Sequence, residues 1–354
     1  MSEIKEPLLG RRFKYNSDFK NPEMSSLALG SLHRVRRKIK DGTYKFEFQL
    51  CYCGSEDSVL LAEMDRYGNY YPFVICRRCG IMRANPRLTN ESYIDFYTNE
   101  YRTLYGDSDR DKEELYLSRV KQSKEVFDFI TDHIKLPPNA VVFDIGCNMG
   151  TMLLPFYENG CHVMGVDYGV EYIEYGKKKT GLNLEIGGVE RLREFSKKAD
   201  LILLNHVFEH FLDLDMELKQ IREVMKPDAY LYVSVPGIFW WVENICGGDI
   251  MGLLQNAHTW QFSLETLKYV MQCNRFELVF GNEKILSIFK NSSIKRNRDE
   301  VPRGEFRKVV TYLEHLEKRY LPKYFLTKIV EPMSLKKPFI KVKNKFFRKE
   351  QIFL

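Results

Sequence analysis

Short apolar runs alternate with helix-like stretches through the middle of the chain. The apolar runs predict β-strands, and they lie at 141–145, 162–167, 184–186, 201–204 and 230–235. The stretches between them have helical spacing and cover 152–159, 171–180 and 216–225. Strands that alternate with helices in this way predict a doubly wound, largely parallel sheet of the Rossmann-like α/β type.

The segments on either side of this alternation have different patterns. Residues 112–134 show an apolar stripe at helical spacing, and a pair of prolines follows them. Residues 46–110 are rich in cysteine, tyrosine and turn residues, and they contain strand-like pieces such as 70–75. The chain therefore divides into four predicted segments: a basic leader of uncertain order at 1–45, a cysteine-rich module at 46–111, an α/β domain at 112–290 and a basic, helical C-terminal extension at 291–354.

Composition places the chain among ordinary globular proteins. The 354 residues are 44% hydrophobic and 29% charged, which argues against a disordered or fibrous protein. An apolar run of about 18 residues would indicate a transmembrane helix, and the sequence has none. The N-terminus lacks the apolar core of a secretory signal. We therefore expect a cytoplasmic protein.

The formal net charge of +6 is unevenly distributed. Lysine and arginine gather in the leader, at 34–40, and in the tail, at 336–349, whereas the body between them is net acidic. Aromatic and aliphatic residues interleave with the lysines of the tail, a pattern that favours contact with an anionic membrane, here its inner face. A solvated tail is the alternative. Nucleic acid is an unfavoured partner, because no recognisable RNA-binding module lies between the basic ends.

Four cysteines have the spacing of a metal site. Cys51 and Cys53 form C-x-C, and Cys76 and Cys79 form C-x-x-C-G further along the chain. Two such turns on facing loops supply the four thiolates of a tetrahedral zinc ion, with no position left open for substrate. Four free cysteines in a reducing compartment are the alternative. The pattern predicts a structural zinc ion.

A glycine-bearing turn, in the sequence VVFDIGCNMG, follows the first strand of the predicted sheet. Ligands of such sheets bind at the carboxyl ends of the strands, and glycine lets the backbone come close to them. Asp167 ends the second strand, where a carboxylate can accept two hydrogen bonds from a ribose diol. Asn148 stands where the dinucleotide fingerprint has its second glycine, so the turn favours a cationic or zwitterionic nucleoside over a pyrophosphate.

These residues resemble a known family. VVFDIGCNMG, with the later segments HVMGVDYG and LILLNHVFEHFLDLDMELKQIREVMKPDAYLYVSVPG, is similar to class I S-adenosylmethionine-dependent methyltransferases over about residues 138–285. With the cysteine module and the segment CRRCGIMRANPRLTNESYIDFYTNEYR, the chain resembles bacterial methyltransferases that carry an N-terminal zinc module. That group includes sugar C-methyltransferases and enzymes of surface-polysaccharide clusters. The resemblance implies S-adenosylmethionine as cofactor and Zn²⁺ as a structural ion.

The resemblance also implies contacts between this chain and the cofactor. The residues concerned follow successive strands of the predicted sheet. They are Asp144, Gly146, Asn148 and Gly150 for the methionine part, Asp167 for the ribose, Tyr168 and Glu190 for the adenine, and Asn205 and His206 beside the sulfonium. The family more often has glycine at the position of Asn148.

Methyl transfer to an alcohol or a carbon acid also needs a base, because neither acceptor is nucleophilic at neutral pH. Glu209 and His210 follow the fourth strand, at the edge where substrate must lie, and the pKa of a histidine is about 6.5. Adjacent residues do not share a helix face, so we expect the two to differ in role, with His210 the first candidate for the base. A structural role is the alternative, as is a divalent ion held by the pair.

His258 is the second catalytic candidate. It follows a glycine-rich loop at 247–252 and is expected to act either as an acid/base group or as a hydrogen-bonding brace. Four tyrosines recur at every fourth position over 93–105, which is helical spacing and predicts an aromatic packing stripe. The resemblance implies, as an alternative, that Tyr97 and Tyr101 contact cofactor or substrate.

The expected activity is methylation of a sugar, either a nucleotide-sugar or a glycan, in polysaccharide or deoxysugar biosynthesis. Whether carbon or oxygen receives the methyl group is open. An RNA methyltransferase or a small-molecule O-methyltransferase is the first alternative. A scaffold that binds the cofactor without catalysis is the second.

Overall fold

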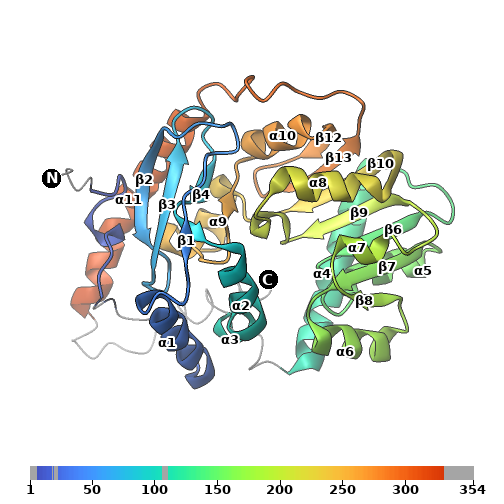
Figure 1. Cartoon of the computed structure of the whole chain (residues 1–354), viewed down its shortest axis with the longest axis horizontal. Coiled ribbons are helices and arrows are strands. Elements are labelled where there is room, and N and C mark those ends of the chain that lie inside the picture. The colour runs from blue at the N-terminus through green and yellow to red at the C-terminus, as the bar shows by residue number, and fades with distance from the viewer. Residues whose placement is uncertain (1–5, 18, 20–22, 106–110, 331–354) are drawn as a thin grey trace. The chain divides into compact units, whose positions relative to one another are not determined.

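The computed structural model describes the chain except for residues 1–5, 18, 20–22, 106–110 and 331–354 (Figure 1). It forms two compact units: unit 1 is Met1–Arg110, Pro236–Thr266 and Val301–Leu354, and unit 2 is Asp111–Val235 and Leu267–Glu300. Each unit is thus assembled from separate stretches, whereas the sequence predicts four consecutive segments. The predicted membrane-contacting tail at 336–349 lies outside the described residues.

Unit 2 is built around a seven-stranded sheet. Its strands are, in spatial order, β12 (Phe276–Gly281), β13 (Leu286–Asn291), β10 (Met225–Ser234), β9 (Ala199–Asn205), β6 (Val141–Ile145), β7 (His162–Asp167) and β8 (Leu184–Ile186). The strands from β10 to β8 run parallel, and β13 pairs antiparallel with both β10 and β12. The predicted doubly wound α/β sheet is confirmed, and the β12–β13 hairpin is an addition to it.

Helices cover both faces of this sheet, with α8 in front of it and α4 behind it in Figure 1. Their bounds are α4 Lys112–His133, α5 Leu154–Glu158, α6 Val170–Thr180, α7 Val189–Leu192, α8 Leu214–Glu223 and α10 Leu264–Cys273, which begins in unit 1. Ile130 of α4 packs into a buried cluster with Phe156 of α5 and Val142 of β6. The predicted helix at 152–159 is instead a 3-10 turn at Thr151–Leu153 followed by α5, which has Pro155 in its first turn.

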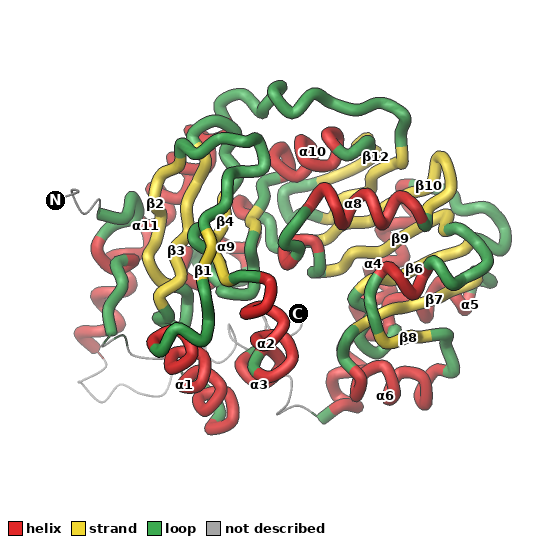
Figure 2. The backbone as a smooth tube through the Cα atoms, in the orientation of Figure 1, coloured by secondary structure: helices red, strands yellow, loops and turns green. Residues whose placement is uncertain are grey.

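Unit 1 contains a smaller, antiparallel sheet (Figure 2). Its order is β11 (Trp260–Gln261), β4 (Met82–Ala84), β3 (Tyr70–Cys76) and β2 (Ser58–Met64), and β1 (Phe46–Glu47) pairs separately with β5 (Arg87–Leu88). The helices are α1 Ser26–Lys40, α2 Asn90–Asn99, α3 Tyr101–Leu104, α9 Ile238–Asn244 and α11 Glu305–Val330, with 3-10 turns at Arg11–Phe13 and Ile250–Leu253. In the described part of the chain, no helix is both long enough and apolar enough to cross a membrane.

The described part of the basic leader is folded into unit 1. Ser25 caps α1, since its side chain accepts a hydrogen bond from the backbone of Ala28. Arg34 of this helix forms an ion pair of 2.9 Å with the buried Glu100. Arg12 forms an ion pair with Glu317 of α11. These basic side chains are therefore partnered within the unit, which leaves less of the leader's charge for an external anion.

Candidate functional site

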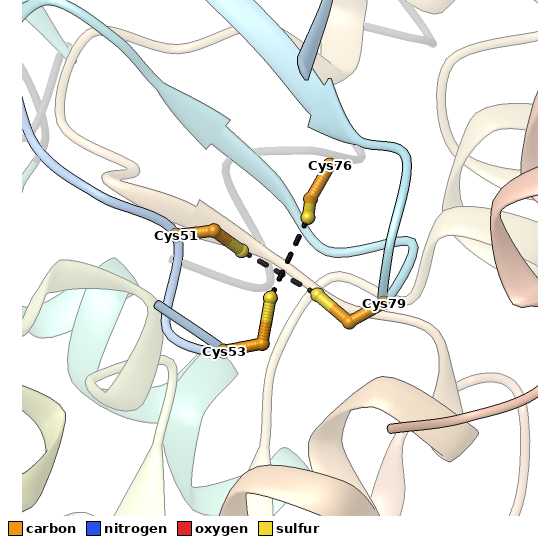
Figure 3. A group of neighbouring side chains, drawn as sticks. All are labelled: Cys51, Cys53, Cys76 and Cys79. Atoms are coloured by element: carbon orange, nitrogen blue, oxygen red, sulfur yellow. Dashed lines mark hydrogen bonds between the residues drawn. The ribbon is translucent and has the colours of Figure 1, made fainter. Parts of the chain in front are cut away.

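The four cysteines of the predicted metal site lie together in unit 1. Cys51 and Cys53 come from the loop between β1 and β2, Cys76 ends β3, and Cys79 lies in the turn before β4. Figure 3 shows their side chains pointing toward a common centre from two loops. The Sγ atoms of Cys51 and Cys79 are 3.4 Å apart and those of Cys53 and Cys76 are 3.6 Å apart. All four are buried, and their Sγ atoms lie within 4.8 Å of one another.

The spacing of the sulfurs fits a zinc ion and not a pair of disulfides. A disulfide joins its sulfurs at about 2.05 Å, whereas a tetrahedral ion with Zn–S bonds of about 2.3 Å holds them roughly 3.8 Å apart. Hydrogen bonding within the cluster lowers the pKa of Cys53 to about 7 and lowers that of Cys76, whereas it raises the pKa of Cys51 and of Cys79. The support for a metal therefore comes from the geometry, and four buried thiols around one centre suit a closed, structural zinc site.

A glycine completes each cysteine turn. The N–H of Gly54 donates to the carbonyl of Cys51 at 2.7 Å, and that of Gly80 donates to the carbonyl of Cys76 at 3.0 Å. The φ angles of the two glycines are 80° and 78°, in the left-handed region that favours this residue. A Cβ on Gly80 would lie 2.8 Å from the backbone nitrogen of Phe306. The second cysteine turn therefore packs directly against the first turn of α11.

In unit 2, the glycine turn lies where the strand order of the sheet reverses. Strand β6 has β7 on one side and β9 on the other, so its loop opens at the edge where such sheets bind ligands. Gly146 has φ 74°, and a Cβ there would lie 2.5 Å from a methyl carbon of Val207. Asn148 has φ 52°, and its N–H donates to Asp167 at 3.0 Å. The structure thus brings the turn and the ribose-binding candidate together.

Two buried side-chain oxygens at this turn have no hydrogen-bond donor among the described residues. Asp144 is buried, and its pKa is raised well above its usual range, first by burial and then by the nearby charge of Asp167. Its Oδ2 atom, like the Oδ1 atom of buried Asn148, accepts no hydrogen bond from the residues that the structure describes. Buried polar atoms without partners are costly. The turn therefore suits a ligand that donates hydrogen bonds, as the ammonium group of a methionine moiety does.

The candidates for the ribose and adenine contacts follow β7 and β8. Asp167 also accepts a hydrogen bond of 2.6 Å from the N–H of Gly169, which orients its carboxylate. Tyr168 is 75% exposed, and a Cβ on Gly188 would lie 2.6 Å from its hydroxyl oxygen. Glu190 accepts a hydrogen bond of 2.7 Å from the N–H of Gly188. Tyr168 and Glu190, predicted to meet the adenine, therefore both lie against Gly188.

At the end of β9, a buried carboxylate lies near two histidines. Asn205 ends the strand, and His206 follows with the uncommon φ of 56°. Glu209 Oε1 is 3.5 Å from His206 Nδ1 and 4.0 Å from His210 Nε2. The side chain of Glu209 is 1% exposed and that of His210 is 15% exposed. The two neighbours thus differ in environment, and Glu209 is placed to stabilise a protonated imidazole.

His258 belongs to unit 1, whereas Glu209 and His210 belong to unit 2. It lies in the loop 254–259, which joins the 3-10 turn at Ile250–Leu253 to β11 and has every residue buried. The N–H of His258 donates to the carbonyl of Gln255 at 3.0 Å. Its predicted role as an acid/base group or as a brace stays a prediction.

The tyrosines at 93–105 form the predicted aromatic stripe. The ring centroids of Tyr97 and Tyr101 are 4.9 Å apart, and those of Tyr101 and Tyr105 are 5.0 Å apart. The stripe runs from α2 into α3, since one helix ends at Asn99 and the next begins at Tyr101. Contact of Tyr97 or Tyr101 with cofactor or substrate stays a prediction.

Two glutamines of unit 1 were not predicted as site residues. Gln255 and Gln261 are 1% and 2% exposed. The Oε1 atom of Gln255 and both amide atoms of Gln261 make no hydrogen bond to any described residue. Buried amides nearly always have a partner, so these groups are candidates to bind a polar ligand. No motif marks them in the sequence, because glutamine near a short strand carries no signal until its burial is known.

Known proteins match parts of the chain. The family Methyltransf_23, described as a methyltransferase domain, matches residues 116–280. A ubiquinone biosynthesis O-methyltransferase of Bartonella bacilliformis is 26% identical over 164 residues, which cover 43% of this chain and 66% of that protein. The C-methyltransferase NovU of Streptomyces niveus is 25% identical over 215 residues, which cover 58% of this chain and 44% of that protein. The chain thus spans less than two thirds of either relative.

Solved structures are similar at low scores. A 1,6-didemethyltoxoflavin-N1-methyltransferase of Burkholderia thailandensis has a TM-score of 0.41 at 16% identity, covering 62% of this chain and 98% of that one. A SAM-dependent methyltransferase from Archaeoglobus fulgidus has a TM-score of 0.38 at 22% identity, covering 56% of this chain and 88% of that one. Scores of this size do not bear on the substrate of this chain.

The segment that matches the methyltransferase family holds the main features of the site in unit 2. It includes the glycine turn after β6, the acid that ends β7, and the carboxylate and histidines after β9. Residues 116–280 of the chain therefore match a methyltransferase domain.

Proposed function

We propose that the protein transfers a methyl group from S-adenosylmethionine to a sugar, either a nucleotide-sugar or a glycan. The observation that carries the methyl-transfer part is the intact turn at the reversal of strand order. There the buried Asp144 and the oriented Asp167 lie within the segment that matches methyltransferases.

The residues at the turn fit the cofactor. S-adenosylmethionine, when bound, supplies an electrophilic methyl group on a sulfonium. Asp167 would accept hydrogen bonds from the ribose diol, while Tyr168 and Glu190 would meet the adenine. The unpartnered oxygens of Asp144 and Asn148 would accept hydrogen bonds from the methionine ammonium group. Gly146 leaves the space that a side chain would fill.

His210 is the first candidate for the base that deprotonates the acceptor. Its Nε2 atom lies 4.0 Å from the buried carboxylate of Glu209. A nearby negative charge stabilises the imidazolium that forms when a histidine takes a proton. His258, in unit 1, is the second acid/base candidate. Glu209 would hold the charge and would not itself exchange a proton with the acceptor.

The sugar part of the proposal is supported by the buried amides of Gln255 and Gln261. An amide offers both donors and an acceptor, and a hydroxyl-rich acceptor can satisfy both kinds of group. The two glutamines lie three residues before and three residues after His258 in the chain. This combination suits recognition of several hydroxyl groups by the segment that carries an acid/base candidate.

O-methylation of a small hydroxylated compound is the second candidate function. It is favoured by the similarity to ubiquinone biosynthesis O-methyltransferases, which are 26–31% identical over parts of the chain. The same base would serve a phenolic hydroxyl, whose pKa is near 10, so the chemistry of unit 2 is compatible with either acceptor.

Methyl transfer from isotope-labelled S-adenosylmethionine tests these proposals. The purified protein is offered a panel of nucleotide-sugars and, in parallel, a panel of catechols and hydroquinones. We expect labelled product from the sugar panel. Labelled product from the phenols alone would replace the sugar reading with the second candidate, and no product from any acceptor would favour a scaffold that only binds the cofactor.

Variants separate binding from chemistry. Asp167→Ala should abolish calorimetric binding of S-adenosylmethionine, and undiminished binding would refute the cofactor placement. His210→Gln should leave that affinity unchanged and lower kcat roughly 100-fold, which is the usual contribution of a general base. His162→Gln, at the exposed start of β7, is the matched control and should retain full activity.

We further propose that the cysteine cluster holds one structural zinc ion. All four tetrahedral positions would be occupied by thiolates, so the ion would stabilise unit 1 and take no part in methyl transfer. Contact of the C-terminal tail with an anionic membrane remains a prediction. A vesicle-flotation assay that compares the full chain with a form ending at residue 330 would test it.

A further inference from the structure

The loop 254–259 is a buried segment without regular secondary structure. Every residue from 253 to 263 is buried. Irregular segments usually run over the surface, because their backbone N–H and C=O groups have no ladder to pair with. The groups that donate hydrogen bonds to the carbonyls of this loop therefore show what holds the loop in place.

The loop is held by residues that are distant in the sequence. The carbonyl of Leu254 accepts a hydrogen bond from the N–H of Arg66 at 2.8 Å, and that of Thr259 accepts one from the N–H of Ala84 at 3.0 Å. Directly after the loop, Trp260 pairs with Arg83 across β11 and β4. Backbone groups of the small sheet and its turns therefore hold both ends of the loop.

Tyrosine hydroxyls hold the middle of the loop. Tyr93 donates to the carbonyl of Asn256 at 3.2 Å, and Tyr97 donates to the carbonyl of Ala257 at 3.2 Å. Tyr105 donates to the side-chain oxygen of Asn256 at 2.8 Å. The four-residue spacing that predicts a packing stripe thus also places three hydroxyls on Asn256 and Ala257, two at backbone carbonyls and one at the side chain of Asn256.

His258 is the residue enclosed by these contacts. The bonds from Tyr93 and Tyr97 end at the carbonyls of Asn256 and Ala257, and the bond from the N–H of Ala84 ends at the carbonyl of Thr259. The backbone on both sides of His258 is therefore fixed by groups outside the loop. An acid/base group must keep its geometry to within a fraction of an ångström to be effective, so such fixation has a direct catalytic use.

We propose that Tyr93, Tyr97 and Tyr105 are positioning residues, which hold the loop 254–259 so that the imidazole of His258 is kept in one orientation. This inference rests on the proposed function, because it takes His258 to be an acid/base group. In this proposal the tyrosines act through the loop, Tyr93 and Tyr97 at its carbonyls and Tyr105 at the side chain of Asn256, rather than through the reacting atoms.

Removal of single hydroxyl groups tests the proposal. Tyr97→Phe and Tyr105→Phe keep the aromatic ring contacts and delete the hydroxyl that bonds to the loop. Tyr15→Phe is the matched control, because Tyr15 belongs to unit 1, is 45% exposed and lies edge-on to Tyr70. The chain has seven histidines, so the ¹³C-histidine NMR signal of His258 can be assigned by comparison with His258→Gln.

The expected result is a change that is confined to the loop. In Tyr97→Phe and Tyr105→Phe, the His258 signal shifts or broadens and the peptide 254–262 exchanges its amide hydrogens faster. The kcat falls roughly tenfold, as expected for a misplaced catalytic group, while KM and the affinity for S-adenosylmethionine stay as in the wild type. Tyr15→Phe changes none of these quantities.

Two results would overturn the proposal. One is an unchanged His258 signal with unchanged amide exchange in both variants. The other is a rise in KM with an unchanged His258 signal, which would mean that the tyrosines contact substrate directly. Failure of the proposed function looks different, because the wild-type protein would then methylate no acceptor whatever the state of the His258 signal.

Discussion

Two loops carry candidate site residues, and they are held in different ways. The loop 146–150 of unit 2 is shaped by glycines with positive φ, and the N–H groups of Gly146 and Cys147 both donate to the carbonyl of Val166. The loop 254–259 of unit 1 contains no glycine. Its backbone is held by tyrosine hydroxyls and by turns and strands of the small sheet.

The two loops differ in how far away in the sequence their hydrogen-bond partners lie. The backbone hydrogen bonds that shape the loop 146–150 come from within the loop and from the next strand of the sheet. The hydroxyls of Tyr93 and Tyr97 lie 163 and 160 positions from their acceptors in the loop 254–259. A loop of the first kind tolerates changes elsewhere in the chain, whereas one of the second kind depends on the whole of unit 1.

The largest effect is expected from breaking the cysteine cluster. Cys79 lies in the turn just before β4, and Ala84 of β4 donates a hydrogen bond to Thr259 of the loop 254–259. A structural zinc site contributes about 10 kcal/mol or more to folding. Cys79→Ser should therefore remove the single zinc ion expected per chain, destabilise β4 and expose the loop to amide exchange.

Metal analysis and amide-exchange mass spectrometry measure these changes. Cys161→Ser, at a half-buried cysteine outside the cluster, is the control and should retain the metal. A wild-type protein without zinc, or a loop that stays protected in Cys79→Ser, would contradict the expectation. Binding of S-adenosylmethionine should survive if the loop 146–150 is locally specified.

A pH effect is expected at Asp65, in the turn next to Arg66. Burial raises the pKa of this carboxyl from 3.8 to about 6, although hydrogen bonds from Tyr67 and Asn69 oppose the rise. The protonated form is therefore favoured in the folded state. Its contribution to stability is complete below about pH 4, is lost as the pH rises through about 6, and amounts to roughly 3 kcal/mol.

Denaturant unfolding from about pH 3 to about pH 7, which extends roughly one unit beyond the expected window at either end, measures this contribution. The free energy of unfolding of the wild type, minus that of Asp65→Asn, should fall across the window. A difference that stays constant with pH would show that folding does not raise the pKa of Asp65. Protection of the loop 254–259 should follow the same curve.

A smaller effect is expected from Gly146→Ala. The new Cβ would lie 2.5 Å from Val207, and φ is 74°. We expect the affinity for S-adenosylmethionine to fall at least about tenfold and the stability by about 1–3 kcal/mol. Gly160→Ala is the control, since its φ is 81° and its Cβ would have no neighbour within 4 Å. An equal loss of affinity in both variants would mean that close packing at Gly146 is unimportant.

The smallest effect is expected at the cap of the tyrosine-bearing helix. Thr89 Oγ1 accepts a hydrogen bond of 3.4 Å from the N–H of Ser92 at the start of α2. Thr89→Ala should cost about 1 kcal/mol and speed amide exchange in the loop 254–259. Ser25→Ala, at the cap of α1, should cost a similar amount and leave the loop protected. Equal amide exchange of the loop 254–259 in the two variants would mean that the stability of α2 does not affect the loop.

Much of unit 2 could be predicted from the sequence, because its strands are short apolar runs between helices. The predicted strand at 141–145 coincides with β6 and that at 162–167 coincides with β7. The predicted helix at 152–159 was wrong in form, since a 3-10 turn precedes a helix that begins at Leu154. Apolar spacing alone did not show where the helix begins, which Pro155 in its first turn helps to fix.

Unit 1 was far less predictable. Strand β11 is only two residues long, and its pairing with β4 joins segments on either side of Asp111–Val235, the longer stretch of unit 2, in the sequence. The leader was expected to be of uncertain order, yet α1 is capped by Ser25 and anchored through Arg34 to Glu100. The β4–β11 pairing and the Arg34–Glu100 ion pair cannot be recognised from local sequence patterns, because each joins segments that are far apart in the chain.

The sequence by itself determined the set of four cysteines that cluster, the glycine turn after β6 and the acid that ends β7. These features follow from metal-ligand spacing, backbone sterics and strand periodicity, all of which act between near neighbours in the chain. Only the tertiary structure decided that Tyr97 holds a carbonyl beside His258 and that Gln261 is buried without a hydrogen-bond partner in the described protein. Burial and long-range hydrogen bonding arise when distant segments pack together, and no local pattern records them.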